Sequence, residues 1–534
     1  MPEPFRVRVA VEAPQHSGIS GPLDYTSEQP LACGTLVRVP LGRRDVPGLV
    51  WPGNAPEGDA PGEKTTDGPL QAPQPELRAV QHVLSSLPPL SARWCELVTF
   101  AAAYYQRGIG EVAMSVLPPE LRKLDDLQLQ RRIARLRKAL DGVVWGATPA
   151  GAPSTEALAL SDEQAEVLAR LDALIAACAS PVVLLHGATG SGKTEVYLRA
   201  AEQILARGRQ VLVLVPEINL TPQLEARFAA RFGGGDAPRR IVSLHSGLTP
   251  AQRLRHWLAA HLGEADLVLG TRLAVFASLP RLGLIVVDEE HDPSYKQQEG
   301  ARYSARDLAV YRGRLESAPV ILGSATPSLE SWQRAEEGRY TRLDMPSRIG
   351  GGVLPQVRTV DMNLVPRGKR GAESQALSPQ LVAALQQRIA RGEQSLVFLN
   401  RRGYAPVLHC GACGWKSACP HCSAWRVFHK IDRSLRCHHC GFAQAVPRAC
   451  PDCGNADIAP IGRGTERLEE QLALVLPEAR VARIDADSTR LKGSLESQLG
   501  AVHAGEVDVL VGTQMIAKGH DFRRITLVAA VNPD

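Results

Sequence analysis

Residues 187–194 read Gly-Ala-Thr-Gly-Ser-Gly-Lys-Thr and lie between an apolar stretch at 181–185 and a segment of helical composition at 195–206. A strand, a glycine-rich loop and a helix N-terminus in this order form a phosphate-binding loop, because glycines let backbone N–H groups turn toward the phosphates. Lys193 can reach the β and γ oxygens, and the Thr194 hydroxyl can hold Mg²⁺. A plain glycine turn, the alternative, does not require Lys-Thr at its end. The loop therefore predicts a nucleoside triphosphate site formed by Gly187, Ala188, Thr189, Gly190, Ser191, Gly192, Lys193 and Thr194.

A second motif, Asp288-Glu289-Glu290-His291, directly follows the apolar run 284–287. Open α/β sheets place their ligands at the carboxyl ends of buried parallel strands. We expect Asp288 to hold Mg²⁺ through water and Glu289 to orient or deprotonate the attacking water. An acidic solvated loop is the alternative, but the loop around Lys193 weakens it. Together the two motifs predict a nucleotide hydrolase rather than a passive binder.

The 534-residue chain is too long for a single hydrophobic core, and its length predicts three or four domains. Hydrophobic residues make up 44% of it and charged residues 22%, values that are ordinary for a globular protein. The sequence has no apolar run of membrane-spanning length and no signal-peptide core at its start. We therefore expect a cytoplasmic protein without membrane spans.

The formal net charge of +5 gives little attraction to a polyanion. Two Zn²⁺ ions bound to eight thiolates would reduce it further, to about +1. Any binding of nucleic acid must therefore depend on local patches.

Short β-like runs at 5–11, 34–39 and 48–51 predict a small all-β or α+β unit within residues 1–72. Two segments rich in small residues and proline, 53–74 and 146–154, are predicted linkers. Residues 124–140 alternate basic and apolar positions, which predicts a solvated helix face, with phosphate contact as the alternative. Residues 90–116 have helical spacing, and we interpret the apolar face as core rather than a base-stacking platform; this face contains Trp94, Leu97, Phe100, Ala101 and Tyr104.

Buried-strand candidates alternate with helical segments from residue 161 onward, which predicts parallel doubly wound sheets. The first sheet is predicted from the strands 182–185, 211–215, 241–244, 267–269, 284–287 and 320–322. The second is predicted from 395–399, 481–484, 509–511 and 527–531. Two similar α/β lobes in one chain predict a nucleotide cleft between them.

Four Cys-x-x-Cys pairs occur between residues 410 and 453. Each pair can present two thiolates to one tetrahedral ion, so four pairs predict two structural Cys₄ zinc sites, and a disulfide framework is a weak alternative in a cytosolic chain. Three pairings exist, and the spacing favours the nested one, with Cys410, Cys413, Cys450 and Cys453 on one ion and Cys419, Cys422, Cys437 and Cys440 on the other. We interpret three histidines as loop residues rather than ligands, namely His421, His438 and His439. We interpret three further cysteines as small buried hydrophobes, namely Cys33, Cys95 and Cys178.

The chain resembles the bacterial primosomal protein N′ (PriA) family of superfamily 2 replication-restart DNA helicases over essentially its whole length. Long runs carry the resemblance, at 187–197, 215–223, 244–248, 270–276, 287–300, 323–331, 398–406, 464–470 and 512–520, together with the eight-cysteine insert. The resemblance implies an α/β fold with two RecA-like helicase lobes, the second incomplete, a double zinc-knuckle insert and a small β-rich N-terminal DNA-binding domain. It also implies the nested pairing of the cysteines.

The resemblance further implies roles for single residues. Gln164 would read adenine, which makes ATP the nucleotide, and residues 324–326 would couple the γ-phosphate to the second lobe. The loop 292–306 is similar to the family's aromatic-rich loop, which senses single-stranded DNA and licenses hydrolysis. Its tyrosines would stack on bases, and its lysine would contact phosphate; the implied DNA-binding residues are Tyr295, Lys296, Gln297 and Tyr303. Ala301 stands where the family commonly has a bulky aromatic residue.

In the N-terminal region, two short segments resemble the family's pocket for the 3′ end of the leading strand. Asp24 would accept a hydrogen bond from the terminal ribose or base, and Gly42 would allow close approach. Leu23 replaces the phenylalanine usual in the family, which weakens a stacking contact. The region 119–158 is shorter than the family's winged helix, so we expect that element to be abbreviated or absent.

The chain ends at Asp534, before the family's arginine-bearing motif and C-terminal domain, so we expect it to be part of a longer protein. The predicted domains are a 3′-end DNA-binding domain (1–118), an abbreviated winged-helix or linker region (119–158), a first helicase lobe (159–348), a zinc insert (408–456) and an incomplete second lobe (349–407 and 457–534).

The predicted function is that of an ATP-dependent 3′ to 5′ DNA helicase, with Mg²⁺ and two Zn²⁺, that recognises stalled forks and D-loops. Its expected partners are DNA, primosome proteins and single-stranded DNA-binding protein. One alternative is a non-enzymatic fork-recognition and primosome-loading scaffold, and a weaker one is an RNA helicase.

Overall fold

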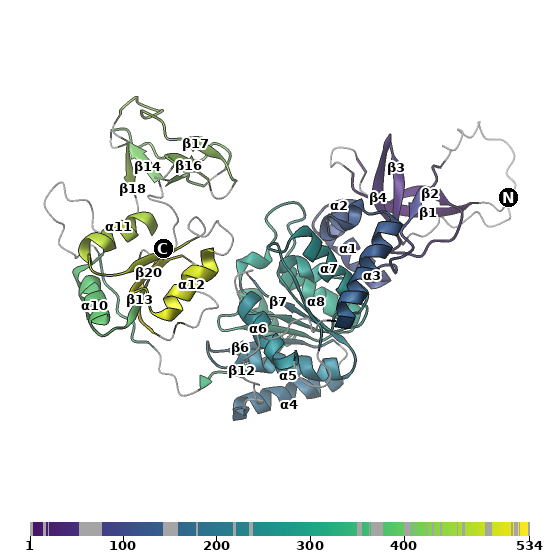
Figure 1. Ribbon diagram of the computed structural model, residues 1–534, viewed down its shortest axis with the longest axis horizontal. Helices are drawn as coiled ribbons and strands as arrows, with labels where there is room; N and C mark the ends of the chain where they lie inside the picture. The colour runs from purple at the N-terminus through teal and green to yellow at the C-terminus, as the bar shows by residue number, and fades with distance from the viewer. Residues whose placement is uncertain are drawn as a thin grey trace. The chain divides into compact units, whose positions relative to one another are not determined.

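The structure is a computed structural model, and it describes residues 4–13, 18–19, 21–52, 77–142, 159–177, 180–216, 221–233, 239–349, 355–362, 364, 377–399, 407–410, 412–422, 424–429, 432–437, 440–456, 458–461, 465–485, 494–513, 516, 522 and 524–531. The chain divides into two compact units, Met1–Val353 and Leu354–Asp534 (Figure 1). Several predicted features lie outside the described residues: the linkers 53–74 and 146–154, Cys178, His438, His439, and motif residues 217–220, 400–406, 464, 514–515 and 517–520. The finer domain boundaries stay predictions.

The first unit begins with an antiparallel sheet of order β2-β1-β4-β3-β5. Its strands are β1 (Phe5–Val11), β2 (Leu23–Ser27), β3 (Leu36–Leu41), β4 (Arg44–Val50) and β5 (His82–Val83). Helix α2 (Ile109–Val116) packs on β1 and β4. The region is therefore α+β.

The helical stretch predicted at 90–116 consists of two helices, α1 (Ala92–Tyr104) and α2. Gln106 lies between them with a φ of 54°, a left-handed conformation that does not continue a helix. Trp94, Leu97 and Ala101 are buried as predicted, but Tyr104 is 68% exposed, so its assignment to the core is wrong.

A short 3₁₀ helix η2 (Leu121–Lys123) precedes α3 (Asp126–Gly142). On α3, Ile133 and Leu136 are buried while Arg131, Arg135 and Lys138 are exposed, as expected for a solvated basic face. Among the described residues of 119–142 there is no strand, so this part of the predicted abbreviated winged helix is helical.

A seven-stranded parallel sheet of order β12-β6-β11-β10-β7-β9-β8 forms the centre of the first unit. Its strands are β6 (Val182–Gly187), β7 (Gln210–Leu214), β8 (Ile241–Leu244), β9 (Leu267–Gly270), β10 (Leu282–Val287), β11 (Val320–Ser324) and β12 (Thr341–Met345). All six predicted strands are present, which confirms the predicted α/β class. The edge strand β12 was not predicted.

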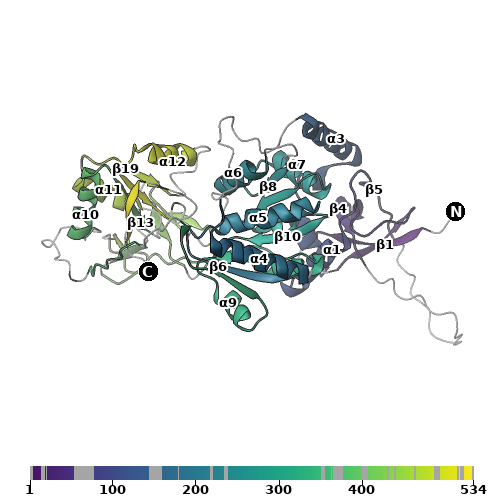
Figure 2. The ribbon, with the colours of Figure 1, turned by 90° about the horizontal axis from the view of Figure 1, so that it is seen from below.

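Helices cover both faces of this sheet. Alternate strand residues point to opposite faces, so Val213 packs with one set of helices and Leu212 and Leu214 with the other. One face is covered by α4 (Asp162–Ala177), α5 (Lys193–Ala206) and α6 (Thr221–Phe232), and Figure 2 shows α4 and α5 in front of the strands. The other is covered by α7 (Pro250–His261) and α8 (Ala305–Glu316), with η4 (Arg272–Phe276), η5 (Pro293–Tyr295) and α9 (Leu329–Glu336) nearby.

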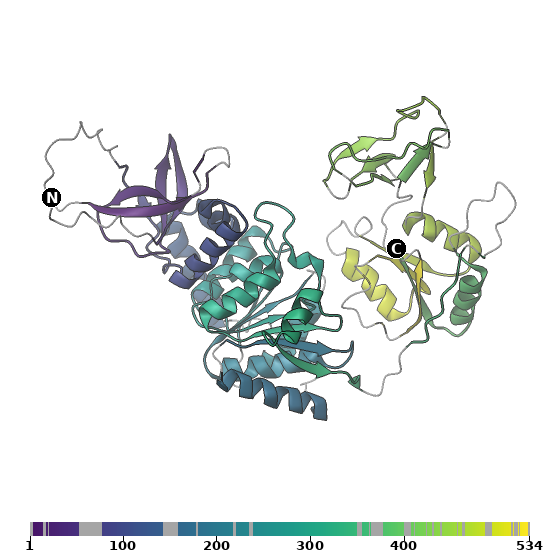
Figure 3. The ribbon, with the colours of Figure 1, turned by 180° about the vertical axis from the view of Figure 1, so that it is seen from behind.

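The second unit contains a parallel sheet of order β19-β20-β13-β21. Its elements are α10 (Pro379–Ala390), β13 (Gln394–Leu399), α11 (Thr465–Val475), β19 (Val481–Ile484), α12 (Ser494–Ala504), β20 (Val509–Gly512) and β21 (Ile525–Val531). The cysteine insert between β13 and α11 forms its own small antiparallel strands, in green in Figure 3. These are β14 (Val407–Cys410), β15 (Val427–His429), β16 (Ser434–Arg436), β17 (Ala443–Ala445) and β18 (Ile458–Ile461). In the part of the chain that the structure describes, no helix is both long and apolar enough to span a membrane.

Candidate active site and zinc centres

The glycine-rich loop joins β6 to α5, as its composition predicts. Gly190 and Gly192 have φ angles of +84° and +83°, which side chains with a Cβ rarely adopt. A Cβ at Gly187 would lie 2.7 Å from the Ser191 hydroxyl, so the loop is closely wound. The Lys193 ammonium donates a hydrogen bond to the Gly187 carbonyl at 2.8 Å. The Ser191 hydroxyl is buried without a hydrogen-bond partner among the described residues, and such a group fits a polar ligand in the loop.

Gln164 is buried at the start of α4 and holds that helix to the loop. Its side-chain oxygen accepts from the Ser161 amide at 2.9 Å, and its amide nitrogen donates to the Gly192 carbonyl at 3.3 Å. The side chain therefore reaches the nucleotide loop, and its predicted role in reading adenine stays a prediction.

Asp288 follows β10 in the middle of the sheet, beside β7 and β11. The Tyr197 hydroxyl of α5 donates to the Asp288 carboxylate at 3.0 Å. Burial and the neighbouring Glu289 raise the pKa of Asp288 to about 6, although Tyr197 and Lys193 act in the opposite direction. A carboxylate that is costly to ionise fits a site that receives a divalent cation.

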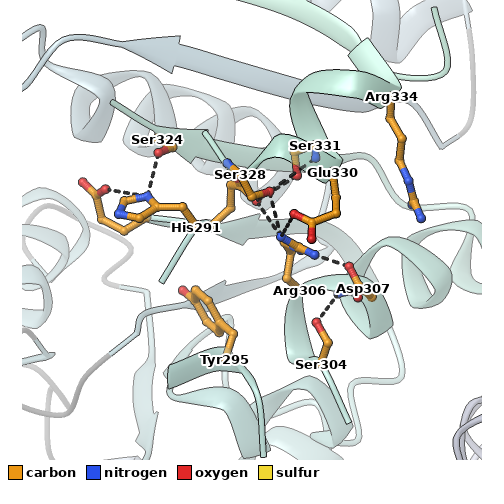
Figure 4. A network of polar contacts seen from close by, with 12 residues as sticks. His291, Tyr295, Ser304, Arg306, Asp307, Ser324, Ser328, Glu330, Ser331 and Arg334 are labelled. Atoms are coloured by element: carbon orange, nitrogen blue, oxygen red, sulfur yellow. Dashed lines mark hydrogen bonds and ion pairs between the residues drawn. The ribbon is translucent and has the colours of Figure 1, made fainter. Parts of the chain in front are cut away.

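Glu289 lies in a turn with a φ of 46°, an uncommon conformation for a residue other than glycine. Its carboxylate lies 3.5 Å from Nδ1 of His291, and the same nitrogen lies 2.7 Å from the Ser324 hydroxyl (Figure 4). The amide of Thr326 donates to that hydroxyl at 2.9 Å. His291 therefore links the acidic motif to the segment 324–326, two motifs that the sequence analysis treated separately.

Glu290 is the residue of this motif that sequence reasoning left without a role. Its side chain is 1% exposed and accepts from the Ser328 amide at 2.6 Å, the Ser328 hydroxyl at 3.0 Å and the Ser331 hydroxyl at 2.8 Å. Arg306 lies 3.4 Å from the same carboxylate and donates to Ser328, as Figure 4 shows. Glu290 thus anchors the start of α9 to the strand end that carries Asp288. The sequence feature that could have pointed to Glu290 is its position as the third consecutive carboxylate after a buried strand.

The aromatic loop 292–306 is closed by an antiparallel bridge between Lys296 and Ser304. The Tyr295 hydroxyl lies 2.6 Å from the Asp288 carbonyl and 2.9 Å from the Leu214 carbonyl. The amide of Gln297 donates to the Tyr303 carbonyl at 2.8 Å. The loop therefore packs directly behind the acidic motif.

The predicted stacking of Tyr295 and Tyr303 on DNA bases does not fit this arrangement. Their side chains are 2% and 5% exposed, and the Tyr303 ring meets Phe276 edge to face. Lys296 is exposed, and its ammonium lies 5.1 Å from the centre of the Tyr105 ring. The spacing of residues in a loop does not distinguish a ring that points inward from one that points outward, so the burial of these rings could not be predicted from it.

Asp24 and Gly42 both lie in the N-terminal sheet. Asp24, on β2, pairs with Arg6 at 2.9 Å, and this hydrogen bond lowers the pKa of its carboxyl. Gly42 forms the turn between β3 and β4 with a φ of +64°, and its carbonyl accepts from Arg78 at 2.6 Å. Arg6 therefore keeps Asp24 ionised, and the role of Asp24 and Gly42 in a 3′-end pocket stays a prediction.

The eight cysteines of the insert gather into two groups of four, in the nested arrangement. Within each group all sulfur atoms lie within 4.8 Å of one another, the groups being Cys410, Cys413, Cys450 and Cys453, and Cys419, Cys422, Cys437 and Cys440. Sulfur pairs are separated by 3.6 and 3.5 Å in the first group and by 3.4 and 3.5 Å in the second. Tetrahedral Zn²⁺ with Zn–S bonds of about 2.3 Å requires about 3.8 Å between sulfurs, so both groups could hold zinc.

Three of the four knuckles share one backbone geometry. In each, the amide of the glycine after the second cysteine donates to the carbonyl of the first cysteine at 2.9 Å; the glycines are Gly414, Gly441 and Gly454. Their φ angles are +79°, +79° and +73°. The sequence Cys-x-x-Cys-Gly therefore aims both thiols at one point.

Three segments match known domain families. Residues 8–118 match the 3′DNA-binding domain (3′BD), residues 164–335 the DEAD/DEAH box helicase family, and residues 419–444 the PriA DNA helicase Cys-rich region (CRR) domain. Among solved structures, that of RecG bound to three-way DNA junction covers 82% of this chain and 45% of that chain, with a TM-score of 0.41 and 16% identity.

Two curated relatives are both named replication restart protein PriA. The protein from Haemophilus influenzae is 36% identical over 99% of this chain and 76% of the relative. The protein from Bacillus subtilis is 44% identical over 71% of this chain, and the match spans 46% of the relative's length. The chain belongs to the replication restart protein PriA family.

Proposed function

We propose that the full-length protein is an ATP-dependent 3′ to 5′ DNA helicase of the cytoplasm that recognises stalled forks and D-loops by their structure and initiates primosome assembly. We include primosome proteins and single-stranded DNA-binding protein among its partners. The observation that carries the proposal is the convergence of Lys193, Thr194 and the half-buried Asp288 at the carboxyl edge of one parallel sheet, with Tyr197 joining the two motifs. Family membership and the 3′DNA-binding domain match support DNA as the substrate.

Residues of this edge have separable tasks. Lys193 would neutralise the phosphates, and Thr194, with Asp288 through water, would hold Mg²⁺, which supplies charge neutralisation. Glu289 would orient the attacking water and accept its proton, and Nδ1 of His291 lies near both the Glu289 carboxylate and the Ser324 hydroxyl. The two Cys₄ groups have no ligand position left for water, so their zinc would be structural.

The test is steady-state ATP hydrolysis by the full-length protein with and without forked DNA that carries a leading-strand 3′ end. Lys193→Ala removes the phosphate contact and should abolish the DNA-stimulated rate, by a factor on the order of 10² or more. Arg339→Ala, at a 72% exposed side chain in the same unit, is the matched control and should leave the rate unchanged.

Fork unwinding that persists in Lys193→Ala would refute the helicase proposal and favour the non-enzymatic scaffold. Equal stimulation by a matched RNA fork would refute the choice of DNA over RNA, because the 2′-hydroxyls would then make no difference.

A further inference from the structure

Helix α1 of the N-terminal DNA-binding region packs against the helicase lobe within one hydrophobic core. The buried indole nitrogen of Trp94 donates to the Phe276 carbonyl of η4 at 2.7 Å. The Phe100 ring stacks on Tyr311 of α8, with ring centres 3.7 Å apart. We call this contact of α1 with η4 and α8 the seam. Because closely packed interiors do not deform freely, a displacement of α1 would be passed through the seam to η4 and α8.

At the end of α1 this seam reaches the aromatic loop through Tyr105. The Ser304 amide donates to the Tyr105 hydroxyl at 3.0 Å, and the Lys296 ammonium lies 5.1 Å from the Tyr105 ring centre. Lys296 and Ser304 are the two residues whose bridge closes the loop. A single side chain from the DNA-binding region therefore contacts both sides of the loop closure.

From the bridge, short contacts lead to the acidic motif and to α8. Tyr295 precedes Lys296 in the chain, and its hydroxyl lies 2.6 Å from the Asp288 carbonyl. On the other side, the Ser304 hydroxyl accepts from the Asp307 amide at 3.3 Å and caps α8. A shift of Tyr105 would thus act on the strand end that carries Asp288 and Glu289.

We propose that Tyr105 is a positioning residue that couples occupation of the N-terminal DNA-binding region by a DNA 3′ end to ATP hydrolysis at Asp288 and Glu289. This inference rests on the proposed helicase function and adds a route by which DNA bound at the N-terminal region changes ATP hydrolysis at Asp288 and Glu289.

The chain offers a matched pair of substitutions. Tyr105→Phe keeps the ring under Lys296 and removes the acceptor for the Ser304 amide. Tyr104→Phe makes the same chemical change one residue earlier, at a side chain that is 68% exposed and stacks on Phe100 within α1 at 5.5 Å. Only the first change alters the contact with the loop.

The experiment measures kcat for ATP hydrolysis by the full-length protein on two single-stranded DNAs of the same length and sequence, one linear with a free 3′ hydroxyl and one circular. Fluorescence anisotropy gives the Kd for each DNA in parallel. In the unaltered protein we expect linear DNA to give about fivefold higher kcat than circular DNA, the low end of usual coupling factors. In Tyr105→Phe we expect the ratio to fall to about one with the Kd for linear DNA unchanged, and in Tyr104→Phe both should stay as in the unaltered protein.

A Tyr105→Phe protein that keeps the excess stimulation by linear DNA overturns the role of Tyr105 and leaves the helicase proposal standing. Equal stimulation of ATP hydrolysis by linear and circular DNA in the unaltered protein also overturns the proposed role of Tyr105, and it leaves the helicase proposal unaffected. A protein that shows no DNA-dependent hydrolysis refutes the proposed function and this inference with it.

Hydrogen exchange provides a readout that does not need activity. Loss of the acceptor in Tyr105→Phe should speed exchange of the Ser304 amide by about fivefold, the factor expected for one hydrogen bond. Exchange as slow as in Tyr104→Phe would show that Tyr105 does not hold the loop, and the inference would fall.

Discussion

The hydroxyl of Tyr197 donates a hydrogen bond to the half-buried carboxylate of Asp288 across 3.0 Å. Tyr197 belongs to α5, which begins at Lys193, and Asp288 directly follows β10, the strand that leads into the acidic motif. This contact therefore ties the two halves of the nucleotide site to each other before any ligand binds. Position 323 must be glycine for this contact to form, because a Cβ there would lie 1.7 Å from the Tyr197 hydroxyl.

Asp288→Asn should raise the stability of the metal-free protein near neutral pH. The folded-state pKa of Asp288 is about 6 against an ordinary value of 3.8. A raised carboxyl pKa means that the folded protein binds the proton more tightly, so stability falls as pH rises through about 4 to 6 and stays low above it. Asparagine has no charge to desolvate, so we expect a gain of up to about 3 kcal/mol above pH 6 and a smaller gain near pH 4.

Urea denaturation in the presence of a chelator, at about pH 4.5 and about pH 7.5, measures this difference. Asp344→Asn is the control, because that side chain is 46% exposed in the same unit and should change stability little. A variant at Asp288 that is no more stable than the unaltered protein at the higher pH would show that burial of this charge is not costly.

Gly323→Ala should destabilise the first unit, because the new Cβ displaces the Tyr197 hydroxyl. We expect a loss of about 1–3 kcal/mol, as for other overpacked cores. Adding Tyr197→Phe removes the clashing oxygen and leaves the ring carbon Cζ, 2.8 Å from the new Cβ, as the nearest atom. The double variant should therefore recover part of the stability that Gly323→Ala loses in thermal unfolding. If the stability changes of the two single variants simply add, the two side chains are not in contact.

Glu290→Gln should destabilise the start of α9 and the strand end beside it. The carboxylate accepts three hydrogen bonds from Ser328 and Ser331 and faces Arg306, so a neutral amide points donor hydrogens at the serine donors and removes one of the anions beside Arg306. We expect a loss of about 2–4 kcal/mol. Glu330→Gln is the matched control: Glu330 also lies near Arg306, at 3.9 Å, but is 69% exposed and should cost below about 1 kcal/mol. Equal losses in a urea titration would contradict the anchoring role of Glu290.

Much of the fold follows from short-range patterns. The strand, loop and helix around Lys193 are local in sequence, and the central strands β6 and β10 of the first parallel sheet contain continuous apolar runs. Each Cys-x-x-Cys pair turns its own two thiols toward one ion, and the spacing between the knuckles favours the nested pairing that the structure shows. The edge strand β12 (Thr341–Met345) was missed, because an edge strand half open to solvent lacks a continuous apolar run.

The contacts that organise the site are long-range, and residue spacing does not reveal them. Tyr197 and Asp288 are ninety-one positions apart, and Ser304 and Tyr105 are further apart still. Tyr295 has the composition of a base-stacking residue, yet its ring is buried because its hydroxyl finds two backbone carbonyls. A polar tip on a large apolar ring suits burial as well as stacking, so only the tertiary structure decides between them.

Cys419→Ser should remove one of two zinc ions from the protein and leave the other. The first cysteine group, with Cys410 and Cys450, shares no sulfur ligand with the second, so metal analysis should fall from about two zinc per chain to about one. Cys33→Ser is the control, because Cys33 belongs to neither cysteine group and its thiol lies 3.5 Å from Cys95 in the first unit. ATP binding by the first unit should persist in Cys419→Ser, since the cysteine insert belongs to the second unit. A fall to zero would mean that the two groups fold only together, and an unchanged content of two would mean that Cys419 is not a ligand.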